Sequence, residues 1–186
     1  AQDFVEAPSQ MLENWIWDPA ILRSLSGHYK DHADKLPNEL SNKLIAAKNV
    51  NSGIYNLRQL LFCAVDQLYH TAPPDDTTVA YGQVMKDVFM IAMTEGTHPE
   101  AGFDHLMAGY DAGYYGYLWS KVYAQDMFSR FKTEGLLNPA LGRRYRTEIL
   151  EKGSSRDEME SIRIFLGREP NEDAFLDSIG LKGDKS

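Results

Sequence analysis

Residues 105–117 bring together the side chains of this sequence that are best suited to chemistry. Tyr110 and Tyr114 are four positions apart, and Tyr114 and Tyr117 are three apart, so each pair shares a face wherever the chain is helical. Phenol groups held in place can stabilise the negative charge that develops on a carbonyl oxygen during peptide hydrolysis. Tyrosines at this spacing are more often core or interface residues, and His105 by itself is more often a loop histidine, so both interpretations stay open.

Glycines are interleaved with these aromatic residues. Gly109, Gly113 and Gly116 allow the backbone to move or to approach a peptide closely. Residues 94–113 also form the longest stretch without helical periodicity, and long loops in compact domains are often functional. The sequence therefore predicts a loop that leads into an aromatic-rich helix.

Glu6 is the second candidate for chemistry. With Asp3 it forms a capping-box pattern, which is the simpler explanation of a lone glutamate at this place. A helix carboxylate can also be the third ligand of a catalytic zinc beside two histidines. The usual source of those histidines, His-Glu-x-x-His, does not occur in the sequence. His28 and His32 have the right spacing, but Tyr29 replaces the general base and the segment is polar, so we predict a loop there.

Helical periodicity dominates the rest of the chain, and no alternating strand-like run is present. The fold class is therefore all-α. The elements that must position the candidate residues are helices over 3–16, 20–25, 37–45, 57–68, 77–93, 114–131, 139–150, 156–166 and 171–178.

Composition excludes several classes of function. Nineteen basic against 27 acidic residues leave a net charge of −8, which argues against a nucleic-acid partner. No apolar run approaches the roughly 20 residues of a membrane span, and we see no signal peptide. The single cysteine, Cys63, cannot form an internal disulfide and is expected to be a core residue, in keeping with a reducing compartment.

Two strings resemble the thimet oligopeptidase and neurolysin family of zinc peptidases. Residues 3–15, DFVEAPSQMLENW, are similar to the family segment that supplies the third zinc ligand, and the ligand position falls on Glu6. Residues 105–120, HLMAGYDAGYYGYLWS, are similar to the family loop whose histidine and tyrosines contact substrate. Shorter similar strings extend the resemblance over nearly the whole chain: 56–59, 165–170 and 173–176.

The resemblance implies a zinc-dependent metalloendopeptidase of short peptides. Residues 1–186 would be a single helical region, the C-terminal portion of its catalytic domain, starting after the His-Glu-x-x-His helix. Glu6 would bind one zinc ion together with two histidines outside this chain. His105, Gly109, Tyr110 and Tyr114 would bind substrate. The residues with catalytic roles would be Tyr117, which would stabilise the oxyanion, together with Tyr114 and His105.

Two departures from the family pattern affect the substrate loop. Asp104 and Ala108 stand where relatives carry glycine, and both are expected to stiffen the loop. The isolated chain should be inactive, and it should expose apolar surface that packs against the upstream part of the enzyme, so that it self-associates. The alternative is a stand-alone, non-catalytic helical module that binds peptides or a protein. We expect a cytoplasmic location, with mitochondria as the second option.

Overall fold

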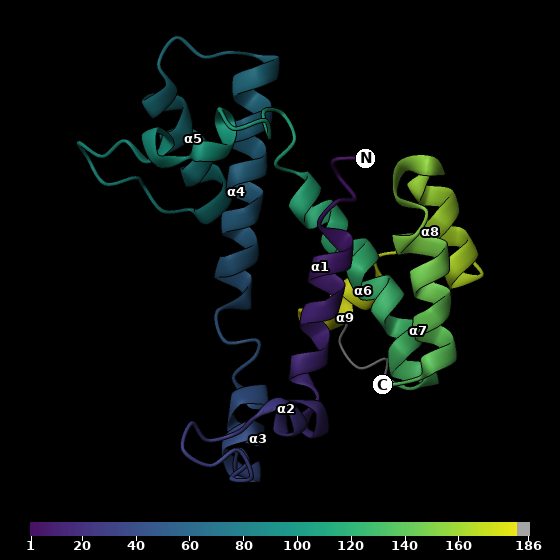
Figure 1. The fold of residues 1–186 in the computed structure, drawn as a ribbon. Helices are drawn as coiled ribbons and strands as arrows, with labels where there is room; N and C mark the ends of the chain where they lie inside the picture. The colour runs from purple at the N-terminus through teal and green to yellow at the C-terminus, as the bar shows by residue number, and fades with distance from the viewer. Residues whose placement is uncertain (182–186) are drawn as a thin grey trace. The chain divides into compact units, whose positions relative to one another are not determined.

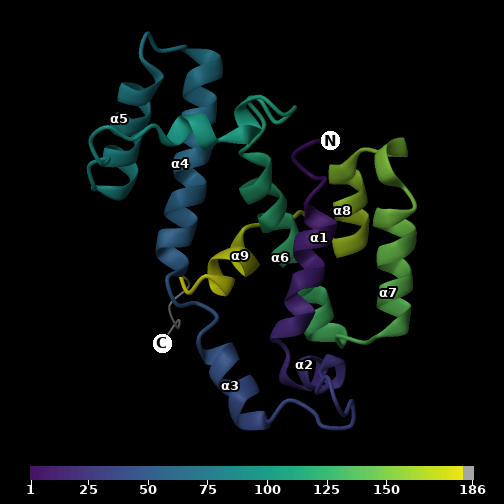
Figure 2. The same ribbon diagram turned by 60° about the vertical axis from the view of Figure 1, so that its left-hand side comes forward.

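The computed structural model describes residues 1–181, and within that range it is helical and contains no strand, which confirms the all-α class (Figures 1 and 2). The chain divides into two compact units. Among the described residues, the first unit contains Ala1, residues 3–50 and residues 120–181. The second contains Gln2 and residues 51–119. None of the helices within residues 1–181 combines the length and the hydropathy that a bilayer crossing requires.

The first unit is built around the part of α6 (Gly116–Glu134) that starts at Ser120. Met127 and Phe128 are buried on this helix, and the Trp15 ring packs against the Phe128 and Phe131 rings at centroid distances of 5.0 and 4.9 Å. Burying the apolar area of these large rings stabilises the unit. The other elements of this unit are α1 (Ala7–Leu12), η1 (Glu13–Trp17), α2 (Pro19–Leu25), α3 (Asn38–Ala46), α7 (Pro139–Tyr145), the π-helical turn η4 (Arg146–Leu150), η5 (Gly153–Ser155), α8 (Glu158–Leu166) and α9 (Asp173–Ser178). Helices α1, α7 and α8 contribute buried residues to the same core as α6.

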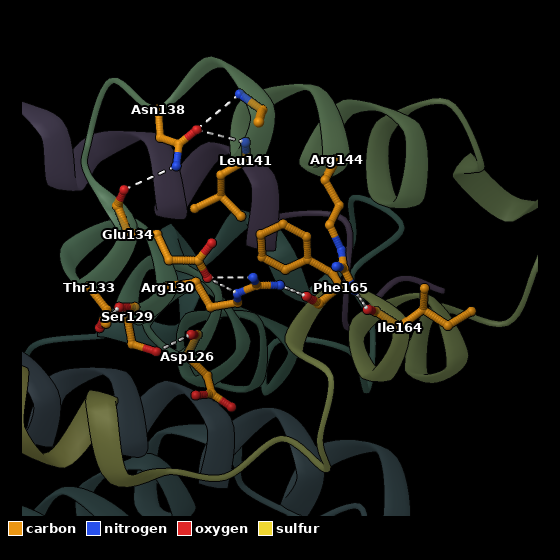
Figure 3. A network of polar contacts seen from close by, with 11 residues as sticks. Asp126, Ser129, Arg130, Thr133, Glu134, Asn138, Leu141, Arg144, Ile164 and Phe165 are labelled. Carbon is orange, nitrogen blue, oxygen red and sulfur yellow. Dashed lines mark hydrogen bonds and ion pairs between the residues drawn. The ribbon is translucent and has the colours of Figure 1, made fainter.

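Two arginine side chains of this unit donate hydrogen bonds to carbonyl groups at the C-terminal end of α8. Arg130 donates to the carbonyl oxygen of Phe165, and Arg144 Nη2 donates to that of Ile164 at 2.5 Å (Figure 3). The last carbonyls of a helix have no partner within the helix, so charged donors there stabilise it. Arg130 Nε also donates to Glu134 at 2.6 Å, and its guanidinium lies 5.3 Å from the centre of the Phe165 ring.

The second unit packs α4 (Ser52–Thr71) beside α5 (Thr77–Phe89), as both ribbon views show. The short 3₁₀ helices η2 (Pro99–Gly102) and η3 (Asp104–Leu106) follow, and the first turn of α6 ends the unit. Its core cluster consists of Leu61, Val65, Tyr81, Phe103, Leu106 and Tyr114.

Several expected helix ends are wrong. The N-cap of the first helix is not Asp3: α1 begins at Ala7 after a run of turns, its N-cap is Glu6, and the Glu6 side chain makes no cap hydrogen bond. Helix α5 ends at Phe89, because Met90 adopts a left-handed φ of 57° that closes the helix. Tyr114 lies just before α6, which begins at Gly116. Such ends depend on tertiary contacts that periodicity does not report.

The buried face of α4 also differs from the expected apolar stripe. Leu61 and Val65 are buried as expected, but Leu60 is 49% exposed and Ala64 is exposed. The fully buried neighbour of Val65 is instead Asp66. The inward face of α4 therefore contains an ionisable group that the apolar pattern could not indicate.

Candidate active site

The four aromatic residues singled out in the sequence form one cluster in the second unit. His105 lies in η3, Tyr110 and Tyr114 precede α6, and Tyr117 is in the first turn of α6. The His105 ring is 5.5, 4.9 and 5.6 Å from the Tyr110, Tyr114 and Tyr117 rings, measured between centroids. Tyr110 and Tyr117 stack at 5.4 Å with 15° between their planes. The fold thus gathers all four residues, although only Tyr117 lies in an α-helix.

The hydroxyl groups of Tyr114 and Tyr117 have different partners. Tyr117 Oη lies 3.2 Å from His105 Nε2, and both residues are partly exposed. Tyr114 is only 7% exposed, and its hydroxyl donates to Gln59 Oε1 at 3.2 Å. A phenol next to an imidazole at a partly exposed position can present its proton to a ligand. Tyr117 is therefore better placed than Tyr114 to stabilise an oxyanion.

Burial raises the pKa of Tyr114 to about 12. The neighbouring Cys63, Tyr117 and Tyr55 contribute less to this rise, and the hydrogen bond to Gln59 opposes it. The Tyr114 phenol therefore stays protonated throughout the neutral range. The Cys63 thiol behaves similarly, because burial and the nearby Asp66 raise its pKa to about 11, so it is not a nucleophile at neutral pH.

Tyr114→Phe should remove one late step from the alkaline titration of the protein. The difference in tyrosinate absorbance between the original and the substituted chain is expected to rise near pH 12, rather than near pH 10 as for an exposed tyrosine. Because the folded state holds this proton more tightly than the unfolded state, the contribution of Tyr114 to stability is present below about pH 10 and is lost as the pH rises towards 12. A difference spectrum that titrates near pH 10 would contradict the buried position of Tyr114.

Sequence reasoning missed the residues that hold this loop in place. The Asp66 carboxylate accepts the backbone N–H groups of Ala112 and Tyr114, and Gln67 Nε2 donates to the carbonyl oxygen of Ala112 at 2.8 Å. One signal was present: Asp66 is the only acidic residue in the 20 residues of α4. A lone carboxylate that directly follows the apolar run Leu60–Val65 could have been flagged.

Two of the three glycines have a clear geometric role. Gly109 has a φ of 79°, which side chains rarely tolerate, and its carbonyl oxygen accepts Gln2 Nε2 at 2.8 Å. A Cβ on Gly113 would lie 3.0 Å from Gln2 Nε2 and 3.2 Å from the Tyr110 carbonyl oxygen. Asp104 and Ala108 are both exposed, and neither has a positive φ.

Glu6 belongs to the first unit, whereas the aromatic cluster belongs to the second. It is the N-cap residue of α1 and is partly exposed. The Ser9 hydroxyl donates to the Glu6 carbonyl oxygen at 2.9 Å and lies 3.2 Å from Oε2, which helps to orient the carboxylate. A carboxylate oxygen is a suitable zinc ligand. In the part of the chain that the structure describes, no three His, Cys, Asp or Glu side chains are grouped to hold a metal, so Glu6 fits as one ligand and not as a complete site.

His28 and His32 lie in the exposed segment between α2 and α3, as the sequence predicted for a loop. His98 is close to Thr78 and Glu100, with Nδ1 2.9 Å from the Thr78 hydroxyl and 3.6 Å from Glu100 Oε1. His98 is therefore held by contacts with Thr78 and Glu100.

Comparison with known proteins agrees with the resemblance seen in the sequence. The family model described as Peptidase family M3 matches residues 1–181. The chain is 44% identical over 184 residues to the thimet-like oligopeptidase of Dictyostelium discoideum, and 42% identical over 187 residues to oligopeptidase A of Salmonella typhimurium. It is 41% identical over 187 residues to saccharolysin of Saccharomyces cerevisiae.

Each of these alignments covers 97% of the chain but only 27%, 27% and 26% of the respective relative. The chain thus spans about a quarter of the length of the curated relatives it matches. The family match extends through both units, from Glu6 in the first to the aromatic cluster in the second. On this evidence, the chain belongs to peptidase family M3.

Proposed function

We propose that residues 1–186 are the C-terminal portion of the catalytic domain of a zinc metalloendopeptidase that hydrolyses short peptides. Both compact units would belong to that one domain. The observation that carries the proposal is the pairing of Tyr117 Oη with His105 Nε2 at 3.2 Å, inside a cluster of four aromatic residues. The family membership and the oligopeptidase names of the relatives support it.

The roles follow from the geometry of the loop. His105, Gly109 and Tyr110 would bind the substrate backbone, because they lie on a partly exposed loop with hydrogen-bonding groups and an accessible backbone. Tyr117 would donate its phenol proton towards the oxyanion. Tyr114 would act together with His105 and Tyr117, because its ring packs 4.9 Å from the ring of His105. Its hydroxyl donates to Gln59.

Glu6 would supply one ligand to a single zinc ion. When bound, zinc supplies a Lewis acid for the scissile carbonyl and lowers the pKa of water. One carboxylate does not hold zinc usefully, since catalytic sites use three protein ligands. The two histidine ligands and the general base would therefore come from the upstream part of the enzyme, and the isolated chain would be inactive. A cytoplasmic location, with mitochondria as the second option, remains a prediction.

A chimera tests this proposal directly. Residues 1–181 would replace the matching segment of oligopeptidase A from Salmonella typhimurium, to which the chain is 42% identical. We expect this chimera to bind zinc and to hydrolyse an internally quenched short peptide, with activity lost on adding a chelator. The 186-residue chain alone should do neither. Chelator-sensitive hydrolysis by the chain alone, or a folded and zinc-loaded chimera without activity, would contradict the proposal.

The alternative is a non-catalytic helical module that binds peptides or a protein partner. It is favoured by one observation, namely that the whole aromatic cluster lies within a single compact unit. In that case the chain should be a stable monomer that binds peptides without zinc, as measured by calorimetry, and the chimera should remain inactive.

A further inference from the structure

The Asp66 carboxylate is almost completely buried, with a side chain that is 1% exposed. Oδ1 accepts the Ala112 N–H at 3.0 Å and Oδ2 accepts the Tyr114 N–H at 2.9 Å. His70, one helical turn later, places Nδ1 3.1 Å from Oδ1 and 2.8 Å from the Asp66 carbonyl oxygen. A buried carboxylate is tolerated only with such partners, and its hydrogen bonds to N–H groups are stronger than those of a neutral acceptor.

Other side chains of α4 hold the same loop. Gln59 accepts the Tyr114 hydroxyl, and the Phe62 ring meets the Tyr114 ring edge-on at 5.4 Å. Gln67 donates to the Ala112 carbonyl oxygen. Residues at these spacings lie close together along a helix surface, so α4 offers a rigid template for residues 112–114. Asp66 is the charged member of this template.

Backbone strain at Ala112 shows why the loop needs restraint. Ala112 has a φ of 56°, a left-handed conformation that is unfavourable for a non-glycine residue. Such a conformation persists only where the surroundings hold it, and the two Asp66 hydrogen bonds hold the backbone at Ala112 and at Tyr114. Tyr114 in turn packs against His105 and Tyr117, with ring centroids 4.9 and 5.0 Å away.

We propose that Asp66 is the positioning residue of the tyrosine loop, which fixes the Ala112–Tyr114 backbone so that His105 and Tyr117 meet a peptide in the productive geometry. This inference rests on the proposed function of the loop. Asp66 contacts neither substrate nor metal in this account and acts only through the Ala112–Tyr114 backbone, which sets the position of Tyr117. A displacement of about 1 Å in a catalytic group is enough to cost on the order of 100-fold in rate.

Asp66→Asn in the chimera is the test. The amide presents an N–H₂ group to one of the two backbone N–H donors, so one hydrogen bond is lost and the loop shifts. We expect kcat to fall by about tenfold to 100-fold with a smaller change in KM. In a Tyr117→Phe background the same substitution should have little further effect, because it acts through Tyr117.

The matched control is Asp126→Asn. Asp126 is an equally buried aspartate of the first unit, which pairs with Arg168 and accepts the Asn171 N–H at 2.9 Å. It should lower thermal stability but leave kcat/KM unchanged well below the unfolding temperature. If Asp66→Asn behaves like Asp126→Asn, or if its effect simply adds to that of Tyr117→Phe, Asp66 is an ordinary structural residue and the inference is wrong.

A second measurement separates this inference from the proposed function. In the 186-residue chain, Asp66→Asn should speed hydrogen exchange at the Ala112 and Tyr114 amides while the amides of Leu61 and Val65 in α4 stay protected. If the chimera without the Asp66→Asn substitution is inactive, the peptidase proposal is wrong. The exchange pattern would still show whether Asp66 holds the loop. Unchanged exchange at both loop amides would overturn the inference, even in an active chimera.

Discussion

Glu6→Ala is expected to abolish zinc binding and peptide hydrolysis by the chimera. The substitution removes one of three protein ligands, so the loss of zinc affinity should exceed the roughly 10- to 100-fold that follows from mutating a residue outside the ligand set. The position also tolerates the change structurally, because Glu6 is partly exposed and no side chain caps α1. Zinc content by atomic absorption and initial rates with added zinc measure the two effects.

Two further variants show whether the Glu6 carboxylate itself is responsible. Glu13→Ala removes an exposed glutamate from η1, directly after α1, and should leave zinc content and rate unchanged. Glu6→Asp keeps the carboxylate but shortens it, and should retain part of the zinc affinity. If Glu6→Ala keeps full zinc content, the metal ligand lies elsewhere and Glu6 is only the N-cap residue of α1.

Tyr117→Phe is expected to lower kcat of the chimera by about 100-fold to 1000-fold, the usual effect of removing one oxyanion donor. Only the hydroxyl is lost. The ring can still stack on Tyr110 at 5.4 Å and pack against Tyr114 at 5.0 Å, so folding should be preserved. Because the hydrogen bond strengthens when charge develops, KM should change little. Steady-state kinetics on a quenched peptide give both constants.

Tyr115→Phe provides the comparison for this prediction. Tyr115 is 40% exposed, lies two residues from Tyr117, and has its ring edge-on to Trp119 at 6.5 Å. Its hydroxyl has no assigned role in the site, so the variant should keep the original kcat. If Tyr117→Phe raises KM and leaves kcat unchanged, the Tyr117 phenol binds substrate without stabilising the transition state, and the oxyanion role fails.

Local patterns in the sequence were sufficient for much of the fold. Apolar periodicity is a property of neighbouring residues, and it correctly indicated an all-α chain with helices at α2, α3, α4 and α8 and a loop between α2 and α3. The family strings around Glu6 and Tyr117 were equally readable without coordinates, because they are contiguous. They led to a family that the comparisons then confirmed.

The tertiary structure decided how the site is held together. Asp66 and its partners Ala112 and Tyr114 are 46 and 48 positions apart in the sequence, and no local pattern reports a contact over that separation. The same is true of Gln59 and Tyr114, which are 55 positions apart. The sequence by itself thus determined which residues could do chemistry and which helices carry them. The folded chain alone decided that His105 meets Tyr117 and that α4 holds their loop, because those contacts come from packing between distant segments rather than from local conformational preference.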